Sequence, residues 1–287
     1  MNRLTRLVAA VAAAGTIAAL GAGSVASAGT RPTKAQEAAK AARAALRYVT
    51  ANPPPTNQDV RSRPTGIGRL SSAQSTNWSG YADVNTSGNT YTKVSSKWTE
   101  PAIKCPTKEQ QLAVFWVGID GWNSSTVEQD GTLAQCYKGT AFYYTWWEMY
   151  PTNSIQTVGT TVKPGDSITA SVVRTGSSYA LKVTDATTSG NNITTTQTCS
   201  TCSNASAEWI AEAPGGPRGE YPLADFTKWT TSAASVTSGS KTGVIKTFPD
   251  DKITMVEGFY TGAYALATPG ALNSAGNQFS VTWNNSY

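Results

Sequence analysis

From Asn77 to the C-terminus, the sequence is a succession of short runs in which apolar and polar residues alternate, with turn residues between the runs. Short strands without intervening helices favour an antiparallel sandwich or barrel. We therefore predict an all-β fold for residues 71–287, as one domain. The runs that predict strands are residues 91–98, 112–117, 141–150, 167–173, 179–183, 207–212, 241–248, 253–260 and 279–283.

The first residues of the chain have the pattern of a signal peptide, which we place at 1–28. Two arginines precede an apolar stretch, Leu7–Leu20, and Ala26-Ser27-Ala28 fits a cleavage site. A membrane anchor would need about 20 apolar residues, and here glycines interrupt the stretch. No other stretch is apolar enough to span a membrane. The sequence therefore predicts a secreted, extracellular protein with no membrane partner.

Residues 29–70 are predicted to form a pro-segment and a linker. The Ala-rich stretch Lys34–Tyr48 predicts a helix, with Thr33 as its N-cap and Asn52-Pro53-Pro54-Pro55 as its stop. The rest of the segment is rich in Pro, Gly and Arg. A basic helix between a signal peptide and a β-domain is typical of a pro-segment. An N-terminal tail without a role is the alternative.

The net charge of +5 is unevenly distributed along the chain. Residues 1–70 hold ten Lys or Arg and two acidic residues, so 23 − 10 = 13 basic and 18 − 2 = 16 acidic residues follow, a net of −3. This balance argues against nucleic-acid binding by the β-domain. It also predicts that carboxylates of the domain attract the basic pro-segment and release it near pH ~4. Cleavage is then expected in the Arg- and Gly-rich linker.

The sequence contains no histidine. This absence excludes Ser-His-Asp and Cys-His catalysis and histidine-based zinc sites. Acid–base chemistry is left to Asp, Glu, Lys and Tyr. We expect no metal site and no cofactor.

Four cysteines allow three disulfide pairings, and the signal peptide favours oxidation. We favour the pairs Cys105–Cys136 and Cys199–Cys202. A redox CxxC motif at 199–202 lacks a surrounding βαβ pattern, and a Cys₄ zinc site lacks a second CxxC spacing.

The stretch 142–151, FYYTWWEMYP, is dense in aromatic residues and holds one carboxylate, Glu148. Strand alternation places Glu148 on one face together with Phe142, Tyr144, Trp146 and Tyr150. A carboxyl group in such a row is desolvated or lies at the wall of a cleft, so we expect its pKa to be raised. A Glu on a solvent-exposed edge between core aromatics is the alternative.

Three further stretches carry polar groups that chemistry could use. FWVGIDG ends a predicted strand in the glycine-flanked Asp120. TVEQDG, which contains Gln129, reads as a short strand closing in an Asp-Gly turn. AEWIAEAP places Glu208 and Glu212 on one face of a strand and Trp209 on the other. Taken singly, each could be a strand with a polar solvent face.

Together with NWSGY at 77–81, these motifs in this order resemble the secreted glutamic peptidases, the eqolisins. The resemblance covers residues 77–212 and implies a concanavalin-like sandwich of two curved antiparallel sheets. It also implies a catalytic Gln–Glu dyad, which would be Gln129 and Glu212 here. The supporting or substrate-binding residues that it implies are Trp116, Asp120, Trp146, Glu148 and Tyr150. The chain departs from the family at Met149, often aromatic there, and at Glu128 and Asp130, which flank the amide.

Such a pair suits peptide hydrolysis by an activated water. A Glu with a pKa near ~4.3 is a competent base in acid. A Gln amide offers the oxyanion a donor whose charge does not change with pH. We therefore expect a monomeric acid endopeptidase that acts on polypeptide substrates, with its own pro-segment as inhibitor.

Two other functions fit the residues. A retaining glycoside hydrolase could use Glu148 and Glu212 with carboxyl groups ~5–5.5 Å apart, which leaves Gln129 without a role. A secreted carbohydrate-binding protein or adhesin could use the Trp and Tyr residues as a binding face. A pro-segment argues against the carbohydrate-binding protein, because a simple lectin has no activity that a pro-segment would need to inhibit.

Overall fold

A computed structural model of the chain describes residues 32–51, 71–84, 88, 90–106, 108–122 and 124–287. The predicted signal peptide and the predicted linker lie outside these residues. Strands predominate, as the alternating runs predict, and every pairing between named strands is antiparallel except that of β1 with β16. No helix in the described ranges is both long and apolar enough to cross a membrane.

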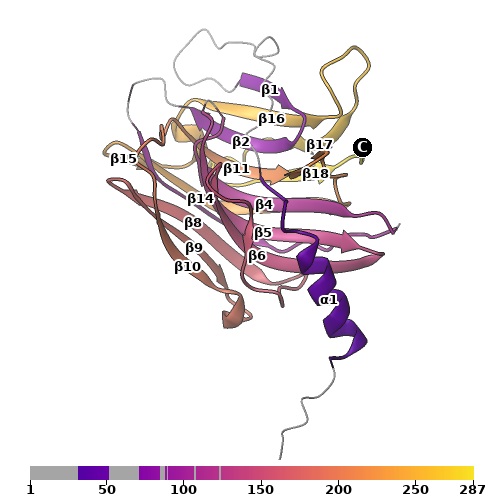
Figure 1. Cartoon of the computed structure of the whole chain (residues 1–287). Coiled ribbons are helices and arrows are strands. Elements are labelled where there is room, and N and C mark those ends of the chain that lie inside the picture. The colour runs from indigo at the N-terminus through magenta and orange to yellow at the C-terminus, as the bar shows by residue number, and fades with distance from the viewer. Residues whose placement is uncertain (1–31, 52–70, 85–87, 89, 107, 123) are drawn as a thin grey trace, which may run out of the picture.

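Most strands of the described residues form one continuous hydrogen-bonded path that folds into two layers (Figure 1). One part of the path is β10 (Ile193–Thr198), β9 (Ser178–Asp185), β8 (Ser167–Thr175), β3 (Tyr91–Thr99), β14 (Lys228–Ser238) and β18 (Phe279–Trp283). It continues through β17 (Ala265–Pro269), β16 (Asp250–Val256), β2 (Trp78–Val84), β11 (Ser206–Glu212), β4 (Gln111–Ile119), β5 (Val127–Tyr137), β6 (Thr140–Tyr150) and β7 (Gln156–Thr157). Beside this path, β1 (Ser71–Ser75) pairs with β16, and β15 (Lys241–Gly243) pairs with β14. A separate hairpin joins β12 (Gly215–Gly216) to β13 (Gly219–Glu220).

The main hydrophobic core lies between the two layers. Side chains of β3, β8, β9 and β14 pack there against side chains of β4, β5 and β11, including Phe115, Val172, Leu181, Trp209 and Trp229. Burying these large apolar side chains supplies the main driving force for the fold. The all-β sandwich that the sequence predicts is therefore confirmed.

A second hydrophobic cluster covers the opposite face of β2, β11, β4, β5 and β6. It contains Trp78, Trp116, Tyr144 and Trp146, which are all buried. Part of its cover comes from residues 46–51, which precede the domain in the sequence. The five strands are thus apolar on both faces, and this second face carries the candidate site.

The helix α1 (Lys34–Ala44) begins where the sequence predicts, because Thr33 and Gln36 form a capping box. It ends four residues earlier than predicted. Leu46 and Val49 are buried against the β-domain, and residues 49–51 form main-chain hydrogen bonds with it. If the helix continued, the main-chain groups of residues 49–51 would form hydrogen bonds within it. In the structure they form hydrogen bonds with the β-domain instead, and the last predicted turn of the helix is absent. Figure 1 shows α1 on the β4–β5–β6 side of the molecule.

Two local predictions are wrong. Asp130-Gly131 is no turn, because β5 runs through both residues to Tyr137. Gly131 is needed there because a Cβ atom would lie 2.0 Å from the Phe115 carbonyl oxygen of β4. The predicted strand at 241–248 is also cut short, since only Lys241–Gly243 is strand and a 3₁₀ turn, Ile245–Thr247, follows.

Both predicted disulfides are present. Cys105–Cys136 joins the loop before β4 to the end of β5. Cys199–Cys202 closes a tight loop between β10 and β11.

Candidate active site

The candidate residues lie on one face of five neighbouring strands, which we call the site face. Pairing register puts Glu208, Gly118, Gln129 and Glu148 in one row across β11, β4, β5 and β6. The next row is Ile210, Trp116, Gly131 and Trp146, and the one after it is Glu212, Val114, Leu133 and Tyr144. Because residues two apart share a face, all three rows point the same way. Register therefore brings together residues from four separate motifs.

The Gln129 side chain is fully buried and donates two hydrogen bonds from its amide nitrogen. Nε2 lies 3.1 Å from Oε2 of Glu148 and 2.7 Å from the main-chain oxygen of Ala51. Both partners are acceptors, so they fix which end of the amide faces them. Gln129 thus presents one oriented N–H to the Ala51 carbonyl group and the other to Glu148.

Glu148 lies beside Gln129 and is likewise buried. Burial raises the pKa of its carboxyl group well above the ordinary value, against smaller opposing effects of hydrogen bonds from the Ala51 amide and from Gln129. The Ala51 amide nitrogen lies 2.9 Å from Oε2 of Glu148. The raised pKa that the aromatic row predicts is confirmed, and the group is uncharged in acid.

Glu212 accepts hydrogen bonds from Trp116 on β4 and from Asn77, which directly precedes β2. Trp116 donates its indole Nε1–H to Oε2 at 2.8 Å, and the Asn77 amide nitrogen lies 3.3 Å from Oε1. Both donors bind the carboxylate form, which has acceptor capacity on each oxygen. Asn77 belongs to the NWSGY motif, but the motif did not predict this contact. Its position next to the first residue of β2, which pairs with β11, is the signal that could have found it.

Trp116 connects the two halves of the site. A Cβ atom added to Gly118 would lie 2.8 Å from the edge of the Trp116 ring and 3.2 Å from the Cβ atom of Gln129. Gly118 therefore leaves the room that brings the indole next to Gln129, while the indole N–H reaches Glu212. Trp78 packs edge-on against Trp116, with ring centroids 4.8 Å apart.

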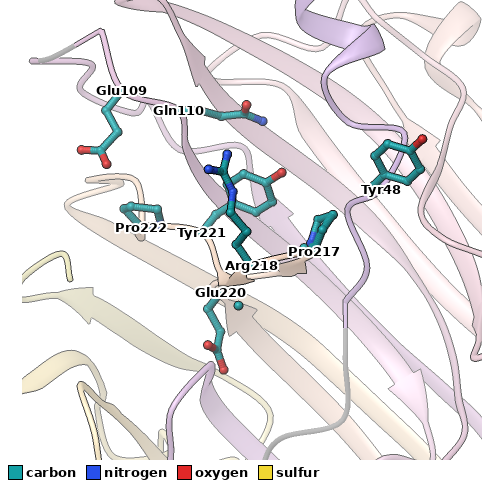
Figure 2. Close-up of a pocket in the computed structure, with 10 residues that line it drawn as sticks. Tyr48, Glu109, Gln110, Pro217, Arg218, Glu220, Tyr221 and Pro222 are labelled. Carbon is teal, nitrogen blue, oxygen red and sulfur yellow. The ribbon is translucent and has the colours of Figure 1, made fainter.

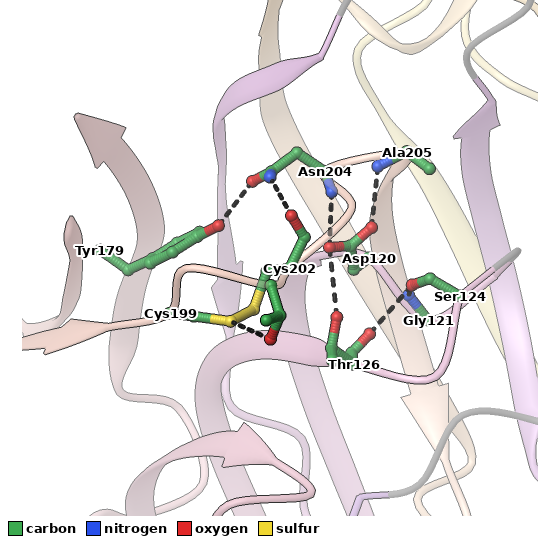
Figure 3. The surroundings of a disulfide bond; sticks show 10 residues. Asp120, Gly121, Ser124, Thr126, Tyr179, Cys199, Cys202, Asn204 and Ala205 are labelled. Atoms are coloured by element: carbon green, nitrogen blue, oxygen red, sulfur yellow. Dashed lines mark hydrogen bonds between the residues drawn. A yellow bond between two sulfur atoms is a disulfide. The ribbon is translucent and has the colours of Figure 1, made fainter. Parts of the chain in front are cut away.

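The other predicted supporting residues have different surroundings. Trp146 is buried in the middle row, and Tyr150 is half-buried at the end of β6. Asp120 follows β4 with a positive φ of 71° and accepts hydrogen bonds from the main-chain nitrogens of Asn204 at 2.7 Å and Ala205 at 2.8 Å. As Figure 3 shows, Asp120 anchors the loop of the Cys199–Cys202 disulfide.

Residues 46–51, which we call the docked segment, cover the site face. Leu46, Val49 and Ala51 are buried in the same cluster as Trp116 and Trp146. The sequence predicts that the pro-segment binds the domain as an inhibitor, but it does not predict that these six residues cover the site face, because they lack a distinctive motif.

A pocket of about 560 Å³ adjoins the docked segment. It lies between Tyr48 and the β12–β13 hairpin, and Figure 2 shows Arg218 in the turn of this hairpin with Tyr221 beside it. Glu109 and Gln110 lie at its other end. Its lining is of mixed polarity, so it suits a side chain with both apolar and polar parts.

One group of three metal-ligand-type residues occurs among the described residues, Glu128 with Cys199 and Cys202. Both sulfur atoms are joined in a disulfide, so neither is available as a thiolate ligand. The group therefore does not fit a metal ion.

Comparison with known proteins places the chain in a family. The profile of the Peptidase A4 family matches residues 76–269, more than half of the chain. Aspergillopepsin-2 of Aspergillus niger is 28% identical over 201 residues, which are 61% of this chain and 69% of that protein.

Two solved structures share the fold. Scytalido-glutamic peptidase with a peptide-based transition state analog superposes with a TM-score of 0.60 at 20% identity, over 73% of this chain and 98% of that one. SCP-B, a member of the Eqolisin family in complex with the tripeptide Ala-Ile-His, gives a TM-score of 0.57 at 19% identity over the same shares. The chain therefore belongs to the Peptidase A4 family, the glutamic peptidases, and is an endopeptidase.

Proposed function

We propose that the protein is a secreted endopeptidase that works in acid, with Gln129 and Glu212 as its catalytic dyad and water as the nucleophile. One observation carries the proposal: the Gln129 amide donates a hydrogen bond to a peptide carbonyl on the site face. Glu212 lies on the same face, two rows away. Both disulfides suit an oxidising compartment, which supports secretion.

Gln129 has the role of stabilising the oxyanion. A donor helps most when it is already aimed at the position where negative charge develops. Glu148 holds the second N–H of the amide, so Gln129 does not reorient during the reaction. The neutral amide keeps this ability at any pH that the fold tolerates.

Glu212 has the role of general base and then general acid. It takes a proton from the water that adds to the carbonyl carbon and later passes this proton to the leaving amine. The N–H groups of Trp116 and Asn77 bind its carboxylate form, as a base needs in acid. Glu148 does not compete for the proton of the water, because it is uncharged under the same conditions.

The N-terminal segment is proposed to inhibit the enzyme by occupying the site face. A substrate cannot reach Gln129 while Ala51 is bound to it. The described contacts of the segment are apolar or hydrogen-bonded, for example Gln135 Nε2 to the Ala42 oxygen at 3.1 Å. The ion pair Lys104–Asp225 is the only one between described residues, and it does not involve α1. Electrostatic attachment of the basic segment stays a prediction, and residues 61–69 lie outside the described ranges.

Casein digestion tests the proposed function. The wild-type chain, incubated in acid, should digest casein at pH 3–4 and far more slowly at pH 7, with no effect of chelators. Glu212→Gln should abolish digestion. Glu208→Gln is the matched control, because Glu208 is buried on the same face of the same strand and lies outside the dyad. Activity of Glu212→Gln near the wild-type level would contradict the assignment.

A further inference from the structure

We propose that residues 48–51 lie on the site face as the acyl side of a substrate, and that the enzyme cuts its own chain directly after Ala51. This inference rests on the proposed function, because it uses Gln129 as the oxyanion donor. It replaces the linker at 61–69 as the place of the first cut.

The main chain of the segment is bound as an added strand. Thr50 donates its N–H to the Gly215 oxygen at 3.0 Å, and the Gly215 N–H donates back to the Thr50 oxygen at 2.8 Å. On the other side, the Ile155 nitrogen lies 3.1 Å from the Val49 oxygen, and the Ala51 N–H donates to Glu148. Such binding holds an extended peptide through its backbone. It therefore fits other polypeptides as well as this segment.

The position of one carbonyl group sets the reacting bond. The Ala51 oxygen lies 2.7 Å from Gln129 Nε2, where an oxyanion donor holds the carbonyl that is attacked. Water adds to the Ala51 carbonyl carbon and gives one proton to Glu212. The C–N bond to the following residue then breaks, and Glu212 passes that proton to the leaving amine. The products are a carboxyl group on Ala51 and a new N-terminal amine on the residue after it.

The side chains of the segment indicate which substrates the enzyme prefers. Ala51 and Val49 are completely buried in a cluster that contains Trp116 and Trp146. A dense apolar wall around Ala51 leaves no room for a large side chain without displacement of its neighbours. We therefore assign a small residue to the position before the cut bond and an aliphatic one to the third position.

The pocket beside Tyr48 extends this assignment to the fourth position. Tyr48 is the fourth residue counted back from the cut, and its ring lines the pocket with 58% of its surface still exposed (Figure 2). Tyr221, Pro217 and Arg218 offer aromatic, apolar and cationic surfaces on the opposite side. An aromatic side chain at this position can pack on all three.

Acid processing of the full chain without its signal peptide tests the inference. At pH 4 the first product followed by mass spectrometry should begin at residue 52. Ala51→Phe should slow this cut at least tenfold. Ala41→Phe is the matched control, because Ala41 lies exposed on α1, and it should be processed like the wild type. A first cut within residues 61–70, at equal rates in all three chains, would overturn the proposal.

A synthetic peptide covers the case in which Ala51→Phe disturbs folding. The peptide of residues 44–56 should be cut by acid-processed wild-type enzyme after its Ala51, and the peptide with Phe at that place at least tenfold more slowly. A peptide that binds without being cut would also overturn the proposal. Casein digestion that depends on Glu212, together with a cut elsewhere in the chain, would overturn this inference alone. Activity without Glu212 would overturn the proposed function.

Discussion

Glu148 and Glu212 look alike in the sequence but differ in their surroundings. Each lies on a strand of the site face, close to tryptophan residues, and each is completely buried. Glu148 accepts hydrogen bonds from a peptide N–H and from Gln129 through a single oxygen, and burial raises its pKa well above the ordinary value. Glu212 accepts an N–H on each oxygen.

The difference supports the roles that we propose, in which the hydrogen-bond donors of a carboxyl group, and not its burial alone, decide what the group does. A protonated Glu148 is suited to hold a peptide backbone and to orient Gln129. Glu212, bound by donors on both oxygens, is suited to accept a proton from water. A retaining glycosidase would need both groups as partners and would leave Gln129 idle. The geometry instead gives Gln129 a peptide carbonyl to bind.

The largest effect is expected for Glu212→Gln. If Glu212 serves as base and as acid, kcat should fall by about 10⁴-fold, the upper end for this kind of catalysis. The fold should persist, because the new amide oxygen still accepts the Trp116 N–H. Single-turnover cleavage of a fluorogenic peptide measures the loss, and circular dichroism checks the fold. A loss of kcat under tenfold would contradict the proposed difference in role between Glu212 and Glu148.

Gln129→Ala should lower kcat by roughly 10²–10³-fold, the usual loss for one oxyanion donor, while KM changes little. Gln135→Ala is the matched control on the same strand and face. Gln135 contacts the Ala42 oxygen and the Tyr144 hydroxyl, so acid-processed enzyme should keep its kcat. Equal losses in both variants would show a general effect of amides in β5.

Glu100 lies outside the site face, so the effect of burial on a carboxyl pKa can be measured there without an effect on catalysis. Burial is the largest cause that raises its pKa, from 4.5 to about 8. As pH rises, the unfolded chain loses this proton first, so the stabilisation is fully present below pH 4.5 and is lost by about pH 8. Tm should therefore fall between pH 4.5 and 8, by about 2–4 °C per kcal/mol lost.

Melting curves in the Glu212→Gln background, where no self-cleavage occurs, measure this slope. Glu100→Gln should make it shallower over the same window. The exposed Glu37 of α1 provides the control, since Glu37→Gln should leave the slope unchanged. A Tm that rises from pH 4.5 to 8 would contradict the assigned effect of burial.

The smallest effect is expected for Glu148→Gln. An amide resembles the protonated acid, and its oxygen can still accept the N–H of a bound peptide. At pH 4, kcat should stay within about tenfold of the wild type, with the change mainly in KM. A pH–rate profile checks this, since its acid limb should not move. A loss as large as that of Glu212→Gln would favour a pair of catalytic carboxyl groups.

The strands that the sequence predicted best are rich in large apolar and aromatic residues. Residues 141–150 and 279–283 were placed within one residue of β6 and β18. The eleven residues of β14, KWTTSAASVTS, were missed because small and polar residues dominate them. Its buried side chains include Thr231 and Ala234, whose burial depends on the opposite layer and not on their own hydrophobicity.

The candidate site was predictable only as far as residue type and face. Period two and motif order indicated which side chains face the same way, but their partners depend on register between distant strands. The pair Asp130-Gly131 predicts a turn because it is typical of hairpins, whereas Gly131 allows the close approach of β4. The position of Ala51 depends on how a remote segment docks, and no local pattern carries that information.

The contacts of the docked segment also indicate at which stage of folding the segment can bind the site face. Ala51 reaches Gln129 and Glu148, which lie 78 and 97 positions later in the chain, and Ala42 reaches Gln135, 93 positions later. Contacts so distant in sequence close late, after the local strand pairs. Residues 46–51 leave the ribosome early but have no partner until β5 and β6 are paired. The surface they cover is complete only at that stage, so a newly made chain acquires its reactive face and the cover of that face in the same late step.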